Sequence, residues 1–476
     1  MTLFLVLVLA TIPNVGPDGN VDFGITGRQQ AVSDSPPGWS ADTLLSLNDG
    51  KESRDPVLTI DTRGRLHAAW KDNRRLRGSD EIHYRCRDSS GWSEIFAVGN
   101  LDTAHNSPGI AVGPDNSVHL CFLRWYGVPY AYYDLGYRRR DGLTGNWDDE
   151  EWLTVDDSLG FAAYPQTAVA SDSVFVFWQK ERSNPAEIWY RYNKGTGWSD
   201  RVAVVTGEAR PNGYYAVVST RDGWVHIVWQ DNRDGTNQLW HRYSQGDTWS
   251  VPELVTNHGY ACTQPSIATD SADNLHLAYS GGQPEGRIHY RVWTRATRQW
   301  QAPTRFYSWS GSPMPKVAVN HATGERHMTH VGYTIGWCLA YKHYDPLGQV
   351  WDTTQLTFNY VNTGAAPLVI DPEGFVHLVF WDQRFGEEEI QYKTNRIQTG
   401  LAAGKAASSR NPLLIRPSVF RSGGLLQSRQ RTALYDASGR KAAVLVPGAN
   451  LVTVQPGVYF ARTADGAEQK VISVHY

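Results

Sequence analysis

Seven tryptophans recur along the chain at nearly constant intervals, and this repeat constrains the fold more than any other feature. They are Trp39, Trp92, Trp147, Trp198, Trp249, Trp300 and Trp351, separated by 53, 55, 51, 51, 51 and 51 residues. Each opens a segment with an apolar run, a tight turn, a strand related to the form (Val/Leu)-His-x-x-Trp, which is complete at 66–70 and 225–229, and a further aromatic strand. From Gly223 to Ser244 the segment reads GWVHIVWQDNRDGTNQLWHRYS. Such a period predicts an array of similar units that bury their faces against one another.

The content of each repeat predicts the architecture. Four short strands per repeat, copied seven times, indicate an all-β protein with a seven-bladed β-propeller over residues 39–397. The 19 Trp and 24 Tyr support strands, because aromatic side chains suit a pleated, half-buried surface. The last repeat ends at a third strand near Gln391 and Tyr392. We therefore expect residues 39–47 to supply the outer strand of the seventh blade and to close the ring.

Residues that recur from blade to blade are predicted to be structural. One repeat position holds His67, His119, His226, His276, His327 and His377, with Phe175 in the third blade. The opening tryptophans are expected to pack between blades, and three Asp-x-Arg turns are read as loop-fixing ion pairs: 72–74, 231–233 and 382–384. His327 and His330 point to opposite faces of one strand, and His321 lies in a turn. We therefore expect no metal site from these three histidines.

Charge and cysteine content exclude several classes of function. The net charge of the whole chain is −3. Residues 401–476 have a net charge of +7, so the rest of the chain has a net charge of −10. A net acidic surface argues against nucleic acid as a partner. Four scattered cysteines, with no Cys-x-x-Cys pair, are too few for a disulfide framework or a zinc-binding motif. We expect no cofactor, no transmembrane segment and a monomer.

Both ends of the chain differ from the repeat region. Residues 1–16 have the apolar run of a secretory signal peptide, which is too short to span a bilayer, and residues 17–38 form a leader. Residues 398–412 are rich in Gly, Ala and Ser and are predicted to be a linker. Residues 413–476 alternate apolar and polar positions between Pro-Gly turns, which predicts a small immunoglobulin-like β-sandwich.

The C-terminal segment resembles the sorting domain of the bacterial type IX secretion pathway. The matching pieces are Asn411-Pro412, the run LYDASGR from Leu434 to Arg440, the run PGVYF from Pro456 to Phe460, and Lys470-Val471-Ile472. The resemblance implies passage across the outer membrane by the secretion machinery, followed by cleavage or surface attachment. A secreted or outer-cell-surface location is therefore expected.

The propeller resembles the bacterial-neuraminidase-repeat superfamily, which includes sialidases. Arg54-Asp55-Pro56-Val57-Leu58 is similar to the strand that opens a sialidase, where the arginine clamps the substrate carboxylate. The superfamily's Asp box is nowhere intact, and the nearest segment, Asp88 to Trp92, is one residue too short. The Gly-x-x-His strands also resemble seven-bladed polysaccharide lyases of the ulvan-lyase type. In those enzymes a histidine and a tyrosine move the proton beside a uronic acid.

Candidate site residues lie on the loops that enter the first strand of each blade and on those that follow the second strand. These loops are longer and more variable than the turns at the other end, and such loops on a rigid scaffold carry function. Their aromatic and charged side chains suit sugars. The candidate binding residues are Arg54, His105, Trp125, Tyr130, Tyr164, Arg182, Arg210, Tyr214, His258, Tyr260, Trp309 and Tyr360.

Three functions remain open on these residues. The first is an exported propeller that recognises glycans without catalysis. The second is a carbohydrate-active enzyme, either an exo-sialidase-like hydrolase or a polysaccharide lyase, with Arg54, Asp55, Glu208, Arg210, Tyr214 and His258 as candidate catalytic residues. A lyase would use His258 with Tyr260 and Arg210. The third is a surface scaffold that binds another protein, because propellers host many functions.

Overall fold

The structure is a computed structural model of the full chain. It describes residues 35–73, 80–99, 104–126, 132–154, 162–180, 186–207, 209–245, 248–282, 287–307, 312–333, 337–358 and 362–396, and eight strands beyond residue 414. The chain folds into two compact units, Met1–Ile397 and Gln398–Tyr476. The signal peptide and leader of residues 1–34 and the predicted linker lie outside the described residues.

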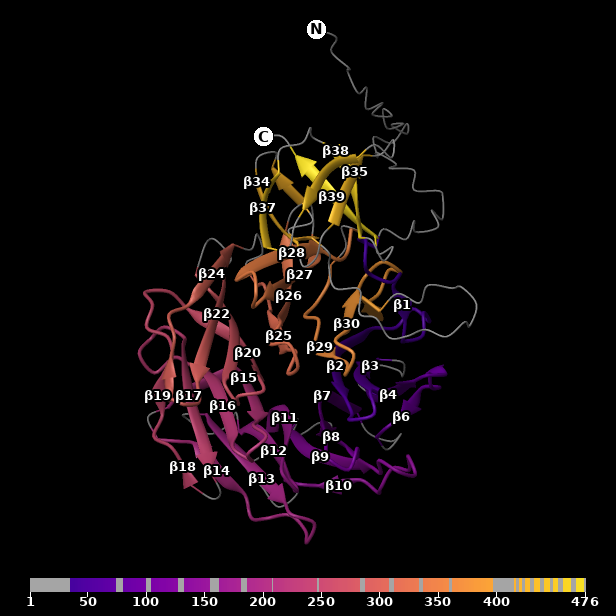
Figure 1. Ribbon diagram of the computed structural model, residues 1–476. Helices are drawn as coiled ribbons and strands as arrows, with labels where there is room; N and C mark the ends of the chain where they lie inside the picture. The colour runs from indigo at the N-terminus through magenta and orange to yellow at the C-terminus, as the bar shows by residue number, and fades with distance from the viewer. Residues whose placement is uncertain are drawn as a thin grey trace, which may run out of the picture. The chain divides into compact units, whose positions relative to one another are not determined.

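The first unit is an all-β, seven-bladed β-propeller, in which successive blades follow one another around a ring (Figure 1). Blade 1 contains β2 (Ser53–Ile60), β3 (Leu66–Asp72), β4 (Glu81–Asp88), β5 (Gly91–Trp92) and β6 (Phe96–Ala97). Blade 2 contains β7 (Ala104–Val112), β8 (Val118–Tyr126), β9 (Tyr132–Arg140) and β10 (Glu151–Trp152). Blade 3 contains β11 (Ala162–Ala170), β12 (Ser173–Lys180), β13 (Glu187–Asn193) and β14 (Val202–Val205).

The remaining blades have the same antiparallel order. Blade 4 contains β15 (Pro211–Ser219), β16 (Val225–Asp231), β17 (Gln238–Gln245), β18 (Thr248–Trp249) and β19 (Glu253–Leu254). Blade 5 contains β20 (Cys262–Thr269), β21 (Leu275–Gly281), β22 (Arg287–Thr294), β23 (Gln299–Trp300) and β24 (Thr304–Tyr307). Blade 6 contains β25 (Lys316–Val319), β26 (Arg326–Tyr333), β27 (Trp337–Asp345) and β28 (Val350–Gln355). Blade 7 contains β29 (Leu368–Ile370), β30 (Val376–Asp382), β31 (Glu389–Thr394) and β1 (Thr43–Leu44).

The ring closes through the N-terminal strand, as the sequence predicts. Thr43 and Leu44 of β1 pair with Tyr392 and Gln391 of β31, so one blade joins strands from both ends of the propeller. The first strands of neighbouring blades contact one another, from β2 through β7, β11, β15, β20, β25 and β29 back to β2. The first strands therefore line the axis. We call the end at which they begin the mouth of the propeller, and the other end its base.

The recurring histidines serve the blade, as predicted. Five of them place Nδ1 within hydrogen-bond distance of a tyrosine hydroxyl on the third strand, as in the 2.6 Å contact of His67 with Tyr84 and the 2.7 Å contact of His377 with Tyr392. The tryptophan of the following blade packs edge-on against the same tyrosine, and 5.2 Å separate the ring centroids of Trp92 and Tyr392. The histidine–tyrosine contact therefore joins strands within a blade, and the tryptophan–tyrosine contact joins neighbouring blades.

The predicted Asp-x-Arg ion pairs are confirmed in the two turns that the structure describes. In blade 4 the Nη2 atom of Arg233 lies 2.6 Å from Oδ2 of Asp231. In blade 7 Arg384 pairs with Asp382 and also with Asp42, where the distance is 2.7 Å. Arg384 thus links the closing segment to its blade. Arg74, in the third turn, lies outside the described residues.

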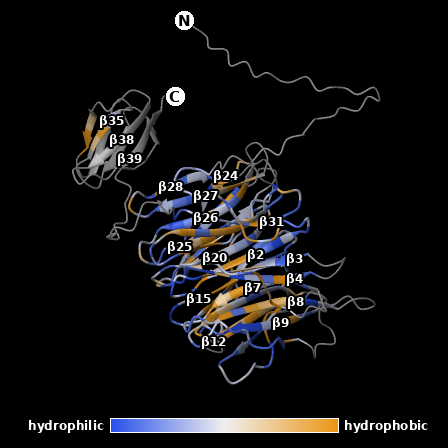
Figure 2. Cartoon of the chain, turned by 90° about the vertical axis from the view of Figure 1, so that its right-hand side faces the viewer, coloured by the Kyte–Doolittle hydropathy of each residue, from blue (hydrophilic) through white to orange (hydrophobic). Residues whose placement is uncertain are grey.

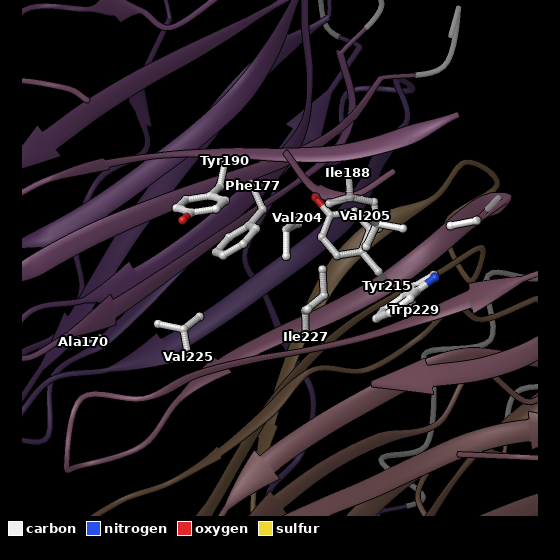
Figure 3. Close-up of a cluster of buried hydrophobic side chains, with 11 residues drawn as sticks. Ala170, Phe177, Ile188, Tyr190, Val204, Val205, Tyr215, Val225, Ile227 and Trp229 are labelled. Carbon is white, nitrogen blue, oxygen red and sulfur yellow. The ribbon is translucent and has the colours of Figure 1, made fainter. Parts of the chain in front are cut away.

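Apolar side chains fill the spaces between blades. Figure 3 shows the cluster between blades 3 and 4, where Phe177, Tyr190 and Tyr215 pack with Ile227 and Trp229. In Figure 2 the strands carry both apolar and polar colouring, and many of the connections are polar. None of the four cysteines is in a disulfide. Among the described residues, no helix has the length and apolar character needed to cross a membrane.

The second unit is also built from strands. One sheet contains β32 (Ile415–Arg416), β34 (Gly424–Ser428) and β37 (Gly448–Val452). The other contains β33 (Val419–Arg421), β39 (Glu468–Val474), β38 (Gly457–Thr463), β35 (Thr432–Asp436) and β36 (Lys441–Leu445). The side chains of Leu434 and Leu445 are buried. The immunoglobulin-like topology and the sorting role stay predictions.

Candidate functional site

A residue with positive φ marks the start of the first strand in six blades. Asp55, Ser107, Tyr164, Gly213, Gln264 and Met314 have φ between 43° and 86°. In blades 1 to 5 the pairing register shifts at this point, as between Arg54 and Val57, which identifies a β-bulge. Positive φ is uncommon for residues other than glycine and persists where surrounding structure enforces it. The bulges place one special residue per blade at the mouth.

Side chains from the preceding blade hold two of these bulges. The Gly213 amide donates a hydrogen bond to Oε1 of Gln179, and the Gln264 amide donates to Oε1 of Gln230, at 3.1 and 3.3 Å. The Gln264 side chain accepts a hydrogen bond from Ser280 and donates one to Ser312. The mouth of blades 3 to 6 is therefore one connected network, which fixes the side chains above it.

Two tyrosines form an open aromatic pair at the mouth of blades 3 and 4. Tyr164 and Tyr214 are 38% and 50% exposed, and their ring centroids lie 5.8 Å apart. The neighbouring residue, Tyr215, points into the core between the blades, since alternate side chains of a strand face opposite sides. Arg210 is exposed just before β15, and its amide donates to Asp231. The mouth of blades 3 and 4 thus carries two exposed ring faces and an exposed arginine four residues before Tyr214.

Four rings gather at the mouth of blade 5. His258 stacks on Tyr260 with 4.8 Å between centroids, and the Tyr260 hydroxyl lies 3.5 Å from Nε2 of His289. Tyr279 also stacks on His289, with 4.9 Å between the ring centroids. Gln238 holds the loop, because its side-chain amide donates to the carbonyl groups of His258 and Tyr260. The Nε2 atom of His258 is buried and has no hydrogen-bond partner.

Burial and nearby cations keep both imidazoles of this cluster neutral at pH 7. Burial, with help from Arg305 and Arg291, lowers the pKa of His258. The same effects, with His258 itself, lower the pKa of His289 to about 4. Burial raises the pKa of Tyr279 well above its usual range. The cluster therefore combines two neutral imidazoles, the hydroxyl groups of Tyr260 and Tyr279, and Arg305, which lies opposite His289 in the sheet.

A separate polar group lies at the mouth of blades 1 and 7. The Nη2 atom of Arg54 is 2.5 Å from Oε1 of Glu388, which is 2% exposed, and 3.6 Å from Glu52. The guanidinium lies over the Trp381 ring, 5.7 Å from its centroid. Burial raises the pKa of the adjacent Asp55, although Lys71 and Arg54 oppose that shift. Arg54 is thus committed to a carboxylate of its own protein.

The other predicted residues divide into three groups. His105 is fully buried, with its ring against Phe122 and Trp152, so it has no exposed surface for a ligand. Trp125 is half-buried at the end of β8, also at the mouth. The remaining candidates lie outside the described residues: Tyr130, Arg182, Glu208, Trp309 and Tyr360.

Sequence reasoning missed His289, Tyr279 and Glu388. His289 belongs to the strand Ile-His-Tyr-Arg, which recurs in blade 1, so repetition made it look structural. A signal for the bulges was present, because a proline follows the strained residue in five blades: Pro56, Pro108, Pro165, Pro265 and Pro315.

Two side-chain groups among the described residues have a spacing that could hold a metal ion. Glu52, Glu387 and Glu388 form one, and Glu325, His327 and His343 form the other. Arg54 already compensates the first group. His321 and His330 belong to neither group, whereas His327 belongs to the second.

A hollow lies at the base of blades 3 and 4, away from the mouth. Its lining includes Ser171, Asp172, Phe175, Tyr192 and Lys194. Phe175 occupies the position that holds histidine in the other blades.

Comparisons with known proteins place the fold. The sequence matches no protein-family profile and no curated protein. An ulvan lyase from a new family of polysaccharide lyases, solved bound to -[GlcA(1-4)Rha3S]-, is similar with a TM-score of 0.53 and 10% identity, over 72% of this chain and 93% of that one. A protein of unknown function from Dyadobacter fermentans gives 0.49 and 10%, over 75% and 99%. A mutant NanB sialidase from Streptococcus pneumoniae gives 0.43 and 9%, over 74% and 70%. The chain therefore shares its propeller fold, and at this identity the fold alone, with an enzyme that acts on polysaccharides.

Proposed function

We propose that the mouth of the propeller binds an acidic glycan along a surface that runs from Tyr164 and Tyr214 to His258 and Tyr260. The exposed pair of tyrosines carries the proposal. The apolar C–H faces of sugars stack on such rings, and the apolar area buried in each contact contributes roughly 25 cal/mol per Å². Arg210 supplies a cation for a carboxylate or sulfate group.

Contacts between blades make this surface continuous. A Cβ atom on Gly213 would lie 3.5 Å from the Tyr164 hydroxyl, and Gly213 follows Asn212, whose carbonyl accepts a bond from Gln230. Gln230 binds the Gln264 amide, and Gln264 binds Ser280. The next residue, Gly281, lies under Tyr260, because a Cβ atom at this glycine would be 3.3 Å from that ring. An extended ligand can therefore contact blades 3, 4 and 5 together.

A second candidate, eliminative cleavage of the bound chain, is favoured by the ring cluster of blade 5. A neutral His258 would take the proton from the carbon beside a uronate carboxyl group. The glycosidic C–O bond then breaks as a C=C bond forms, and the departing oxygen takes a proton from Tyr260. Arg305 would neutralise the carboxylate. Hydrolysis by Arg54 and Asp55 has weaker support, because Arg54 is paired with Glu388.

Export belongs to the same proposal. The apolar run of residues 1–16 and the tail motifs support secretion to the outer cell surface, where large glycans are accessible. The location is tested by measuring the amounts of the full chain and of a tail-deleted variant inside the cell and outside it. The full chain should be found outside the cell, and the tail-deleted variant should stay inside. Retention of both inside the cell would contradict export.

A binding assay with matched variants tests the proposed function. The full chain is titrated with uronic-acid polysaccharides and with neutral ones, using calorimetry. Tyr164→Ala with Tyr214→Ala should weaken binding about tenfold or more, since two stacking contacts are lost. Phe385→Ala, an exposed aromatic residue in a turn of blade 7, is the control and should bind normally. Equal binding by all variants would overturn the proposal, and capture of a protein partner at Tyr164 and Tyr214 would favour the scaffold function.

A further inference from the structure

Blade 6 departs from the repeat around its recurring histidine. In blades 1, 5 and 7 the Nε2 atom of that histidine faces an aspartate, as in the 3.1 Å contacts of His276 with Asp270 and of His377 with Asp371. In blade 6 the matching turn position holds Asn320. The Nε2 atom of His327 has no hydrogen-bond partner, although the residue is only 3% exposed. A buried polar atom without a partner is costly, which indicates that something else satisfies it.

Two further departures place ligating groups in front of that atom. His343 lies directly opposite His327 in the strand pairing, and Glu325 precedes His327 by two residues, so all three share one face of the sheet. The matching pairs are Arg65 with Cys86 in blade 1, Asn274 with Val292 in blade 5 and Phe375 with Thr394 in blade 7. Among these blades, only blade 6 has a carboxylate and a second imidazole there.

We propose that Glu325, His327 and His343 bind a divalent transition-metal ion, with Zn²⁺ the best match to two imidazoles and a carboxylate. Their ligand atoms all lie within 4.8 Å of one another, and Nε2 of His343 is 3.6 Å from Oε1 of Glu325. Two ligands of a tetrahedral zinc ion, each about 2.1 Å from it, are about 3.4 Å apart. Small side-chain movements therefore close the site.

Neighbouring groups orient the ligands as metal sites require. The Tyr341 hydroxyl lies 2.6 Å from Nδ1 of His327, which leaves Nε2 directed at the ion. The Thr323 hydroxyl donates to Oε2 of Glu325 at 2.9 Å. Such outer partners fix the tautomer and orientation of ligands. Glu325 and His343 are 24% and 18% exposed, so water can take the fourth position. This site is at the base, away from the glycan surface.

Zinc titration tests the proposal against a plain ion pair between His343 and Glu325. The full chain is freed of metal with a chelator and titrated with Zn²⁺ by calorimetry, and the melting temperature is measured with and without the ion. The site predicts one tight equivalent and a higher melting temperature. Co²⁺ should give the intense visible bands of a tetrahedral site with nitrogen and oxygen ligands.

Three variants assign the binding to these residues. Glu325→Gln and His343→Gln should each weaken Zn²⁺ binding at least tenfold and remove the rise in melting temperature. His321→Gln, which removes an exposed histidine four residues before Glu325, is the control and should bind as the wild type does. The proposal is overturned if the wild type binds no tight equivalent, or if His343→Gln and His321→Gln bind alike. Circular dichroism confirms that each variant is folded.

Discussion

The indole of Trp39 packs edge-on against Tyr341, with 4.9 Å between the ring centroids, across 302 positions of chain. The same contact joins every blade to the one before it: Trp92 to Tyr392, Trp147 to Tyr84, Trp198 to Tyr137, Trp249 to Tyr190, Trp300 to His241 and Trp351 to Tyr290. The tryptophan repeat is therefore a closed circle of contacts between blades. Trp39 supplies the contact that joins the last two blades.

Trp39→Ala should destabilise the propeller. The side chain is 8% exposed, and removing a buried tryptophan costs about 3–5 kcal/mol of the free energy of unfolding. Urea unfolding followed by tryptophan fluorescence measures the change. Leu347→Ala, at a residue that is 76% exposed, should change stability by less than about 0.5 kcal/mol. If the two variants unfold at the same urea concentration, β-strand pairing alone closes the ring.

Arg54→Gln should destabilise the mouth of blades 1 and 7, because it leaves the buried carboxylate of Glu388 without its cation. The expected loss is about 1–3 kcal/mol, since the arginine side chain is 40% exposed and water partly screens the pair. The double variant with Glu388→Gln should recover most of that loss, because no buried charge remains. Urea unfolding of the two single variants and the double variant measures the coupling. If the loss of unfolding free energy in the double variant equals the sum of the losses in the two single variants, the ion pair between Arg54 and Glu388 contributes little to stability.

Stability should fall as the pH drops from about 6.5 toward 4. Burial lowers the pKa of His119 to about 4, whereas an unfolded histidine titrates near 6.5, so the unfolded state binds more protons in this window. Burial also lowers the pKa of His289 to about 4, so His289 contributes to stability in the same pH window. Above pH 6.5 the histidine contribution is complete, and within the window each such histidine removes up to about 1.4 kcal/mol per pH unit. Urea unfolding at pH 7, 6 and 5 measures the slope.

His119→Asn provides the comparison for that slope. The variant lacks one of the groups that take up a proton on unfolding, so its stability should depend less steeply on pH between 6.5 and 4. Its stability at pH 7 should be lower, because the hydrogen bond to Tyr137 is lost. A slope equal to that of the wild type would mean that His119 is not held neutral in the folded protein.

His258→Gln should abolish eliminative cleavage and weaken glycan binding much less than the loss of both Tyr164 and Tyr214 does. The neutral imidazole is the proposed base, whereas stacking on Tyr164 and Tyr214 supplies binding. Absorbance of the new C=C bond near 232 nm measures cleavage, and mass spectrometry separates it from hydrolysis, which adds water. Because the pKa of His258 is lowered, the rate should persist below pH 6.5. His321→Gln is the control for a histidine outside the mouth.

Three results would contradict this prediction. Full cleavage by His258→Gln would exclude His258 as the base, and fragments that have gained water would point to a hydrolase. Binding of the glycan by the wild type without any cleavage would leave the recognition proposal intact and overturn the eliminative mechanism.

The repeat made the architecture readable from the sequence. The features that predict a blade are local: strand periodicity, turn residues and the spacing of tryptophans such as Trp92, Trp147 and Trp198. They recur in every blade. The number of strands in the last repeat predicted that residues 39–47 close the ring. The pairing of Thr43 with Tyr392 confirms this prediction. For the same reason the recurring histidines were predicted to be structural, and five of them contact a tyrosine hydroxyl of their own blade.

The site depended on contacts that no local pattern contains. Arg54 suggested a clamp for a ligand carboxylate, but Glu388, 334 positions away, already occupies it. His105 lay on a promising loop, but it is buried against Phe122. His289 reads as a repeat residue until the loop before β20 brings Tyr260 to its ring.

The way a propeller is stabilised explains why the blades could be predicted from the sequence and the site could not. Within a blade, hydrogen bonds between consecutive strands and alternating burial act over a few residues, so the amino-acid pattern alone determines the blades and their number. Between blades, the partner of a side chain depends on ring closure, on the β-bulges at the mouth and on the path of each connecting loop. Only the tertiary structure therefore decided that Tyr164 meets Tyr214, that His258 meets Tyr260, and that Glu325, His327 and His343 converge.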